Sequence, residues 1–494
     1  MSVAEDRTAA TPARADLRFA VVGAGMSGIL TAIKLEEAGF RNVEIFERES
    51  KLGGTWRDNT YPGLSCDVPS HVYRFRFAPN PDWSHRFSPG PEIWEYLNRV
   101  AHEYGIAQRI RYNTEIARAE WKDGVWHVTP KGGETEVYDI VITATGVLRD
   151  PVYPDIPGLE DFEGPMFHSA RWDHSHDWRG KRVGIIGTGS TSIQITSAIA
   201  KEVGHLSLFQ RTPQWVVPME NPAIPEQERA ALRKDPKRME DLYEFLADRF
   251  QNTFARAVVG DHEELAKVEK ACEENLATVK DPELRRKLTP NYQAACKRLI
   301  MSDEFYREVQ RDNVEVVTDR IERIEKNGVR TADGRLHELD MLVCATGFEA
   351  HKFMRPMEIV GRGGHTMEEE WAEANRAYRS VAVPGFPNFF MLVGPNSPIG
   401  NFSLIMISEM QFAYIMQLVD RIASGEVAEV EPTREATDRF NQSIRDAMKN
   451  TVWVSGCSSW YLDKNGNPAM WPWDFETFER EMEHPDFDDF RLVS

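Results

Sequence analysis

Two glycine-rich segments carry the residues with the clearest chemical use in this sequence. They read Gly23-Ala24-Gly25-Met26-Ser27-Gly28 and Gly187-Thr188-Gly189-Ser190-Thr191-Ser192. In each, small residues with G-x-G-x-x-G spacing follow an apolar run and precede a helical pattern, although serine takes the third glycine position of the second segment. Such a turn lets the backbone approach a pyrophosphate, and the free N–H groups of the next helix bind its charge. Two segments therefore predict two bound dinucleotides and redox chemistry.

The residues that end the next apolar runs distinguish the two sites. Glu47 ends the run after the first segment, where an acid accepts hydrogen bonds from a ribose. The run after the second segment ends instead in Arg211-Thr212, with no acid. An arginine at this place suits a 2′-phosphate, so the second site is predicted to take NADPH rather than NADH.

Two longer patterns are more specific than the glycines. Phe162 to Asp173 reads F-x-G-x-x-x-H-x-x-x-W-D, and Gly54 to Asp67 reads G-x-W-x-x-x-x-Y-P-x-x-x-x-D. Both patterns resemble those of the type I Baeyer–Villiger monooxygenases, and the resemblance extends over roughly residues 17–475. That family consists of flavoproteins that use NADPH and O2 to insert an oxygen atom beside a ketone carbonyl, giving an ester or lactone.

The resemblance implies that the first dinucleotide is FAD. Trp56 is then expected to form a wall for the flavin, and Asp67 to bring a carboxylate near its ring. The residues expected to contact FAD are Gly23, Gly25, Ser27, Gly28, Glu47, Gly54, Thr55, Trp56, Asp67, Val68, Tyr73 and Leu404.

The resemblance likewise implies that a basic pair, Lys297-Arg298, completes the NADP site. In the family the lysine meets the NADP phosphate and the arginine enters the active site. The residues expected to contact NADP are Gly187, Thr188, Gly189, Ser190, Thr191, Ser192, Arg211, Thr212, Lys297 and Arg298.

Arg298, Asp67 and His168 are the expected catalytic residues. In the family, reduced flavin and O2 give a C4a-peroxide that must stay deprotonated to attack a carbonyl. A guanidinium remains charged at any relevant pH, so Arg298 is expected to stabilise the negative charge of the peroxide and then of the adduct. Asp67 is expected to hold Arg298 as its ion-pair partner. His168 is expected to support the linker between the domains and couple their movement to catalysis, with Trp172 and Asp173 anchoring the far side.

The fold that positions these residues is predicted to be α/β, with two Rossmann-like domains for FAD and NADP and a helical insertion. Buried strands are expected over 17–22, 138–146, 181–186 and 340–348, and helices over 91–104 and 405–418. Residues 221–290 are charged and rich in helical patterns, without strand signals. The expected division is a flexible tail (1–16), the FAD domain (17–148 and 385–494), a linker with the NADP domain (149–220 and 291–384) and the insertion (221–290).

Composition excludes several other classes. The net charge of −19 argues against nucleic acid as a partner, because phosphate binding needs a basic surface. The five cysteines form no C-x-x-C pair, which leaves no zinc site and no redox disulfide of that kind, and a reduced cytoplasmic setting fits best. No apolar run is long enough for a membrane span, and no metal site is expected.

Three alternatives remain at this point. A heteroatom-oxidising flavin monooxygenase would use the same cofactors but a protonated hydroperoxide; the Trp172-Asp173 form of the hinge and Arg298 argue against it. A disulfide reductase would need the missing C-x-x-C. A flavin-binding sensor would not need Asp67, His168 and Arg298 together. Which ketone is the substrate, linear, cyclic or bulky, and the oligomeric state are open.

Overall fold

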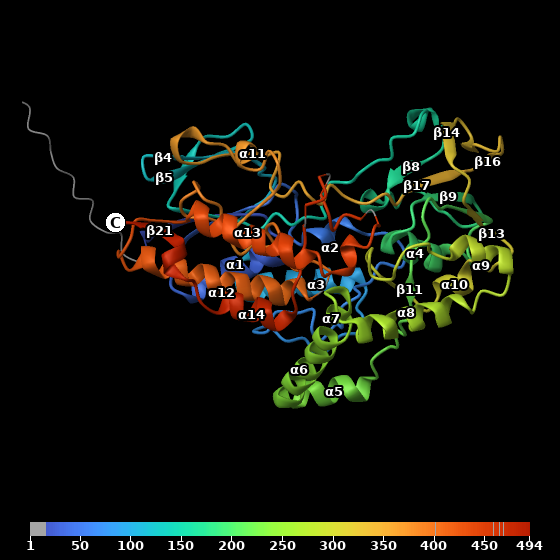
Figure 1. The fold of residues 1–494 in the computed structure, drawn as a ribbon, viewed down its shortest axis with the longest axis horizontal. Coiled ribbons are helices and arrows are strands. Elements are labelled where there is room, and N and C mark those ends of the chain that lie inside the picture. The colour runs from blue at the N-terminus through green and yellow to red at the C-terminus, as the bar shows by residue number, and fades with distance from the viewer. Residues whose placement is uncertain (1–15, 401, 458, 464, 468) are drawn as a thin grey trace, which may run out of the picture.

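The computed structural model describes residues 16–494 except 401, 458, 464 and 468. The tail expected over residues 1–16 therefore lies outside the described residues apart from its last position. Figure 1 shows two α/β lobes side by side, with a group of helices below the junction between them.

The first lobe is built on a parallel sheet with strands from both halves of the chain. Its order is β19-β7-β1-β2-β3, and every neighbouring pair is parallel. The strands are β1 (Arg18–Val22), β2 (Asn42–Phe46), β3 (Ile110–Arg111), β7 (Ile140–Thr143) and β19 (Phe389–Met391). All four residues of β7 are buried, as expected for a central parallel strand covered on both faces.

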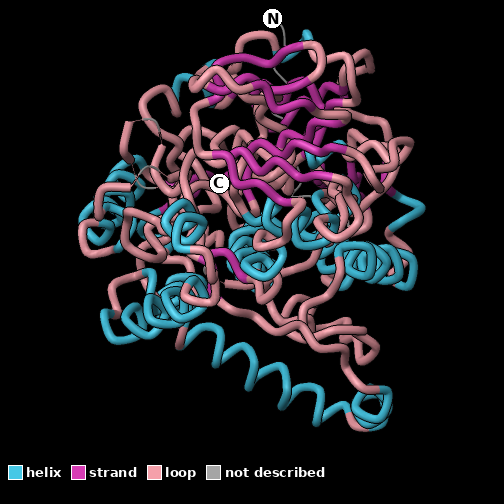
Figure 2. Tube along the Cα trace, turned by 90° about the vertical axis from the view of Figure 1, so that its right-hand side faces the viewer, coloured by secondary structure: helices cyan, strands magenta, loops and turns pink. Residues whose placement is uncertain are grey.

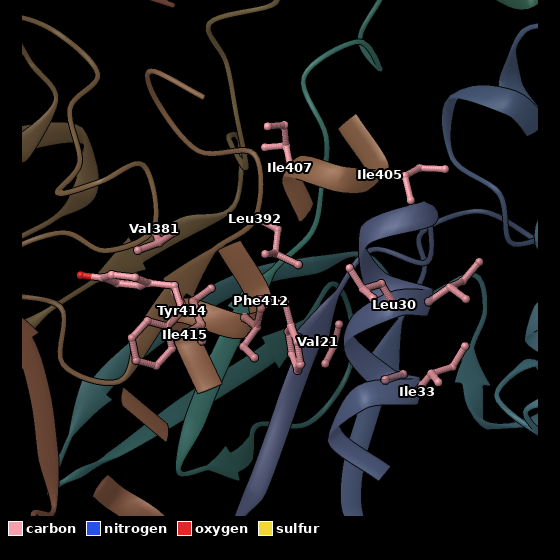
Figure 3. Packing of buried hydrophobic residues seen from close by; sticks show 14 of the residues in the cluster. Val21, Leu30, Ile33, Val381, Leu392, Ile405, Ile407, Phe412, Tyr414 and Ile415 are labelled. Atoms are coloured by element: carbon pink, nitrogen blue, oxygen red, sulfur yellow. The ribbon is translucent and has the colours of Figure 1, made fainter. Parts of the chain in front are cut away.

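Three helices cover one face of this sheet: α1 (Met26–Glu37), α3 (Gly90–Glu103) and α12 (Leu404–Ala423). Figure 3 shows Val21 of β1 close to Leu30 of α1 and to Phe412 of α12. A smaller mixed sheet, with antiparallel and parallel pairs, packs on the other face, where the rings of Trp126 and Phe389 lie 5.5 Å apart. That sheet contains β4 (Ile116–Lys122), β5 (Val125–Pro130), β6 (Glu136–Tyr138) and β18 (Glu358–Val360).

The second lobe repeats the plan of the first. Its parallel sheet has the order β13-β10-β9-β17-β8 and is covered by α4 (Ser190–Ile199). The strands are β8 (Met166–His168), β9 (Arg182–Ile186), β10 (His205–Phe209), β13 (Val314–Val317) and β17 (Met341–Cys344). The two parallel sheets confirm the predicted α/β class with two dinucleotide-binding domains.

The charged segment forms five helices, as its pattern predicts. They are α5 (Glu226–Lys234), α6 (Pro236–Asn252), α7 (Phe254–Val258), α8 (His262–Leu276) and α9 (Pro282–Leu288). Aspartate side chains at 235, 261 and 281 accept backbone N–H groups at the starts of α6, α8 and α9. In Figures 1 and 2 the α5–α6 part of the insertion projects at the bottom of the molecule, away from both sheets. In contrast, α9 lies beside β13, where Lys287 Nζ donates to the carbonyl oxygen of Val316 at 3.2 Å.

The remaining elements are short or close the first lobe. The last strands, β20 and β21, form an antiparallel pair. No helix in the described part of the chain combines the length and apolar character needed to cross a bilayer. The helices and strands not named above are α2 (Thr55–Asp58), α10 (Phe305–Glu308), α11 (Met367–Glu370), α13 (Arg434–Met448), α14 (Phe475–Glu483), β11 (Val216–Val217), β12 (Ile300–Met301), β14 (Ile321–Glu325), β15 (Gly328–Thr331), β16 (Leu336–Glu338), β20 (Glu429–Pro432) and β21 (Phe490–Val493).

Candidate active site

The turn between β1 and α1 is a cradle that only glycine fits. Gly23 has φ +106°, and a Cβ there would lie 2.5 Å from the carbonyl oxygen of Ala144. A Cβ on Gly28 would lie 1.8 Å from the carbonyl oxygen of Gly23. No side chain among the described residues caps the first turn of α1, whose N-cap is Gly25. The N–H groups of that turn are thus available to an anionic ligand.

Glu47 is buried at the end of β2 and is tied to this turn. Its Oε2 accepts the Ala24 N–H at 3.0 Å, and its Oε1 accepts the Glu49 N–H at 3.0 Å. Arg57 lies 3.2 Å from Oε1. Because a carboxylate has about four acceptor sites, Glu47 keeps capacity for the ribose hydroxyls that the sequence analysis assigns to it.

The loop after Leu52 closes over the same turn. A Cβ on Gly54 would lie 3.2 Å from the Cα of Gly25, so the two backbones are in close contact. Trp56 Nε1 donates to Tyr73 Oη at 3.1 Å, and the two rings lie 5.6 Å apart. Thr55 donates to the carbonyl oxygen of Leu148 at 3.1 Å. Trp56 and Tyr73 therefore form one aromatic unit beside the first cradle.

The other residues expected in the FAD site are placed as follows. Ser27 Oγ lies 2.8 Å from Ser408 Oγ, which joins α1 to α12. Val68 is buried, and Leu404, half-buried, begins α12. Val68 belongs to the apolar cluster against which Trp56 packs, and Leu404 packs against the neighbouring cluster.

The turn between β9 and α4 repeats the first cradle. Gly187 has φ +119°, and a Cβ there would lie 2.3 Å from the carbonyl oxygen of Ala345. Gly189 is the N-cap of α4, and no described side chain caps the turn that follows, which contains Ser190 and Thr191. Ser192, at the third fingerprint position, is fully buried, in line with its expected packing role.

Two cations, Arg211 and Lys297, lie beside this second cradle. Thr188 Oγ1 donates to the carbonyl oxygen of Thr212 at 2.7 Å, which fixes the segment carrying Arg211. Tyr292 Oη donates to the carbonyl oxygen of Pro213 at 2.9 Å, and Lys297 Nζ lies 5.1 Å from the Tyr292 ring. Burial, and then the charge of Arg211, lower the pKa of Lys297. A lysine whose charge is opposed by a neighbouring arginine is suited to bind an anion such as a phosphate.

Arg298 and Asp67 form an ion pair between the two lobes' loops. Arg298 Nη2 donates to Asp67 Oδ2, and both side chains keep about 30% exposure (30% and 29%). The charge of Asp67 is the largest cause that raises the pKa of Arg298, and it outweighs the opposing effect of burial. The guanidinium is therefore permanently charged, yet it remains accessible from the space between the lobes.

Sequence reasoning missed two residues that surround this guanidinium. The hydroxyl of Tyr461, which is only 3% exposed, lies beside Arg298, and burial raises the pKa of Tyr461. Gly400 has φ +94°, and a Cβ there would lie 2.7 Å from Arg298 Nη1. Tyr461 lies in an aromatic-rich stretch that carries no motif of its own, and no local signal marks Gly400.

His168 ends β8, at the junction of the linker and the second sheet, and its ring contacts residues other than Asp67 and Arg298. Its Nδ1 accepts the Ala170 N–H at 3.1 Å, and its ring packs 5.6 Å from Tyr153 and 5.8 Å from Phe348. Burial lowers the pKa of His168 to about 4, so the ring is neutral at physiological pH. These contacts suit a supporting role better than proton transfer.

The two other residues of the hinge pattern differ in burial. Trp172 is buried against Phe167 and Trp178 at 5.0 and 5.8 Å between ring centroids. Asp173 is exposed, its Oδ1 accepts the N–H and the hydroxyl of Ser175, and its Oδ2 lies 3.5 Å from His176 Nε2. Trp172 therefore anchors the hinge, whereas Asp173 shapes a local turn.

The two lobes also meet through the loop that follows Trp56. Tyr61 Oη donates to Gln194 Oε1 of α4 at 2.9 Å, and Gln194 Nε2 donates to the carbonyl oxygen of Ser65 at 3.0 Å. Gly63 has φ +80°, and a Cβ there would lie 2.6 Å from the carbonyl oxygen of Gln194. The loop that carries Asp67 is thus fixed to the second nucleotide helix.

A disulfide joins Cys296 to Cys457, with 6.2 Å between their Cα atoms. The sequence analysis predicted no such pair, because the two residues are 161 positions apart. The other cysteines that the structure describes, Cys66, Cys272 and Cys344, are free and buried.

The two cradles fit the two dinucleotides that the sequence predicts. Each combines a glycine turn that a Cβ would fill with an uncapped helix start, and the second adds two cations. FAD needs the acid at the first site, and NADP needs the cations at the second.

Comparisons with known proteins agree with this geometry. The family model of flavin-binding monooxygenase-like proteins matches residues 16–357. A Mycobacterium tuberculosis protein named as an uncharacterized monooxygenase is 47% identical over 92% of this chain and 91% of its own. A Streptomyces coelicolor protein named Baeyer-Villiger monooxygenase is 39% identical over 97% of this chain and 93% of its own. The crystal structure of cyclohexanone monooxygenase from Rhodococcus sp. Phi1 bound to NADP+ has a TM-score of 0.87 and 31% identity over 97% and 99% of the two chains.

Proposed function

Because the chain belongs to the flavin-binding monooxygenase family, and within it to the Baeyer–Villiger monooxygenases that use FAD and NADPH, we propose that its substrate is a ketone and that Arg298, held by Asp67, is its main catalytic residue. The reaction is ketone, O2, NADPH and a proton giving an ester or lactone, NADP+ and water. The observation that supports the roles is the ion pair between a guanidinium of one lobe and a carboxylate of the other.

The bound flavin supplies the reduced centre that activates oxygen. Arg298 would stabilise the negative charge that develops on the ketone carbonyl oxygen while the new C–O bond forms. Asp67 raises the pKa of Arg298 and so keeps it charged. Asp67, Tyr461 and the space left by Gly400 set the orientation of the guanidinium. A preorganised donor in a closed site stabilises such charge far better than water does.

The remaining predicted residues would bind the two cofactors. Gly23, Gly25 and Gly28 would approach the FAD pyrophosphate, and Glu47 its ribose. Trp56 and Tyr73 would bound the flavin edge of the cavity. Arg211 and Lys297 would share the 2′-phosphate of NADPH. The domain division, with residues 385–494 returning to the FAD domain, and the cytoplasmic location stay predictions. Within the span 291–384 given to the NADP domain, β18 pairs with β4 of the first lobe.

The test is a panel of linear, cyclic and bulky ketones, with ester formation followed by gas chromatography. Wild-type enzyme is expected to convert at least one ketone, and Arg298→Ala to lose about 10²–10³-fold in kcat while still being reduced by NADPH. Arg298→Lys should fall between them, because a point charge replaces a fixed planar donor. Arg286→Ala, which removes an exposed arginine of α9, is the matched control.

The outcomes separate the alternatives. Turnover of amines or sulfides without ketones would reassign the enzyme to heteroatom oxidation. Full activity of Arg298→Ala on ketones would refute the role of Arg298 and leave the family assignment intact.

A further inference from the structure

The Cys296–Cys457 disulfide joins two segments that meet at the ion pair. Cys296 is fully buried and directly precedes Lys297 and Arg298. Cys457 lies four residues before Tyr461, the residue beside the Arg298 guanidinium. One covalent bond therefore connects the backbone of the basic pair to the backbone that carries its aromatic neighbour.

The segment on the Cys457 side has little other regular structure to hold it. The described residues between Val454 and Phe475 form no helix or strand. Tyr461 and Trp453 pack in the same apolar cluster as Cys296, with their rings 5.1 Å apart. The Ala469 N–H donates to the carbonyl oxygen of Tyr461 at 3.0 Å, within the segment itself. Asn465 Nδ2 also donates to the carbonyl oxygen of Glu373 at 2.7 Å, and Tyr461 contacts Arg298 itself. The disulfide is the covalent bond between this segment and the residues next to Arg298.

Only one of the two sulfurs of the disulfide is accessible to a small thiol. Cys457 is half-buried, so a small thiol can reach its sulfur, whereas Cys296 is enclosed. Attack on the Cys457 sulfur releases Cys296 as the leaving thiolate.

We propose that Cys296 and Cys457 form a redox-controlled clamp that positions Lys297 and Arg298, an inference that rests on the function proposed above. A small-molecule disulfide closes the clamp by oxidising the Cys296 and Cys457 thiols. The two cysteines lose two electrons and two protons and form the protein disulfide, while the small-molecule disulfide takes them up and becomes two small thiols. Two equivalents of a small thiol open it by the reverse exchange. The closed clamp holds the Tyr461 segment against the basic pair, and the open clamp releases it. The cysteines are positioning residues, since neither is required to touch substrate.

The first experiment establishes the bond without reference to activity. FAD-loaded full-length enzyme is equilibrated with oxidised glutathione or with dithiothreitol, denatured, and its thiols are alkylated and counted. The clamp predicts three alkylated thiols (Cys66, Cys272 and Cys344) after oxidation and all five after reduction. Hydrogen exchange of peptides covering residues 451–471 should be faster in the reduced form. Five thiols under both conditions, or equal exchange rates, would overturn the proposal.

The second experiment measures its effect on the site. Opening the clamp is expected to raise KM for NADPH at least about fivefold and to lower the ester formed per NADPH consumed, because small displacements of positioned groups are costly. Cys457→Ser should behave like reduced wild type in either buffer. Cys272→Ala, which removes a buried cysteine but keeps the clamp, should respond as wild type does.

The two proposals fail in different ways. A stable disulfide that changes only the melting temperature, with KM and the ester-to-NADPH ratio unchanged, would make the bond merely structural and refute the clamp. Absence of ester in both redox states, with normal flavin reduction by NADPH, would instead refute the ketone assignment, and the NADPH KM difference would still test the clamp.

Discussion

At the scale of single residues, the site depends on how the Arg298 guanidinium is enclosed. Asp67 supplies its charge partner, Tyr461 a neutral hydroxyl, and Gly400 the empty space at Nη1. Asp67 contacts Nη2 and Gly400 faces Nη1, so each neighbour limits a different part of the guanidinium. Changes of a single methyl group should therefore alter catalysis.

Gly400→Ala is the smallest such change. Its Cβ would lie 2.7 Å from Arg298 Nη1 and 3.4 Å from Tyr461 Oη, and φ +94° adds strain of about 1–2 kcal/mol. Displacing the guanidinium is expected to lower kcat for the ketone by roughly 10- to 100-fold. Gly39→Ala is the control: φ there is +93°, and no described atom lies within 4 Å of its Cβ. Equal kinetic losses in the two variants would show that backbone strain alone is responsible.

Lys297 gives a pH dependence at the same scale. Burial and Arg211 lower its pKa below the ordinary 10.5, and only the charged form binds a phosphate. Affinity for NADPH is therefore present at neutral pH and is lost as pH rises through the lowered pKa. KM for NADPH should rise at a lower pH than an ordinary lysine would give, and Lys297→Met should flatten the profile. Identical profiles for wild type and Lys297→Met would exclude Lys297 from the phosphate site.

At the scale of elements, α12 connects the first nucleotide turn with the rest of the lobe. Its Ser408 meets Ser27 of α1, and its Glu409 accepts the Arg76 N–H at 2.9 Å. Burial raises the pKa of Glu409 to about 7, despite the opposing charges of Arg74, Lys34 and Arg76. The helix therefore carries a carboxyl group that costs stability when it ionises.

Ionisation of Glu409 makes the stability of the folded protein depend on pH. A raised folded-state pKa means that Glu409 contributes stability in full below its ordinary value of 4.5, and that this stability is lost as pH rises through about 7. Glu409→Gln keeps an acceptor for the Arg76 N–H but cannot ionise. It should melt about 2–4 °C higher than wild type at pH 8 and nearly equally at pH 5, by circular dichroism.

Glu476→Gln, on the exposed side of α14, serves as its control and should show no pH-dependent difference. A higher melting temperature for Glu409→Gln at pH 5 than at pH 8 would reverse the sign and contradict the burial argument.

At the scale of the whole molecule, the two lobes are fixed to one another close to the chemistry. The loop of Tyr61 to Ser65 docks on Gln194 of α4, and Asp67 follows two residues later. The insertion is anchored separately, where the buried Arg74 lies 4.7 Å from the Tyr243 ring of α6. Domain contact and ion-pair geometry are thus coupled through one short loop.

Gly63→Ala tests this coupling. Its Cβ would meet the Gln194 carbonyl oxygen at 2.6 Å and the Ala198 Cβ at 2.9 Å, and a helix backbone cannot yield cheaply. The variant should lose about 1–3 kcal/mol more stability in urea unfolding than Gly124→Ala, and its KM for NADPH should rise. Gly124 has φ +79°, close to the +80° of Gly63, and no described atom within 4 Å of its Cβ. Equal losses in the two variants would mean that the lobes do not depend on this contact.

Much of the fold follows from local sequence. The runs before Gly23 and Gly187 became β1 and β9, and the helical patterns after them became α1 and α4. Burial patterns and glycine turns are properties of contiguous residues, so the sequence alone predicted both cradles and the α/β class. The helical insertion was likewise predicted from charge and periodicity.

What the sequence determined by itself is thus the pair of nucleotide turns, the family and the basic pair that distinguishes the second site. Only the tertiary structure decided the surroundings of Arg298: Tyr461 and Gly400 beside it, the Tyr61 loop docked on α4, and the bond between Cys296 and Cys457. The reason is physical. These contacts join residues about a hundred or more positions apart, and their distances depend on how sheets, insertion and C-terminal segment pack, which no local pattern of residue types encodes.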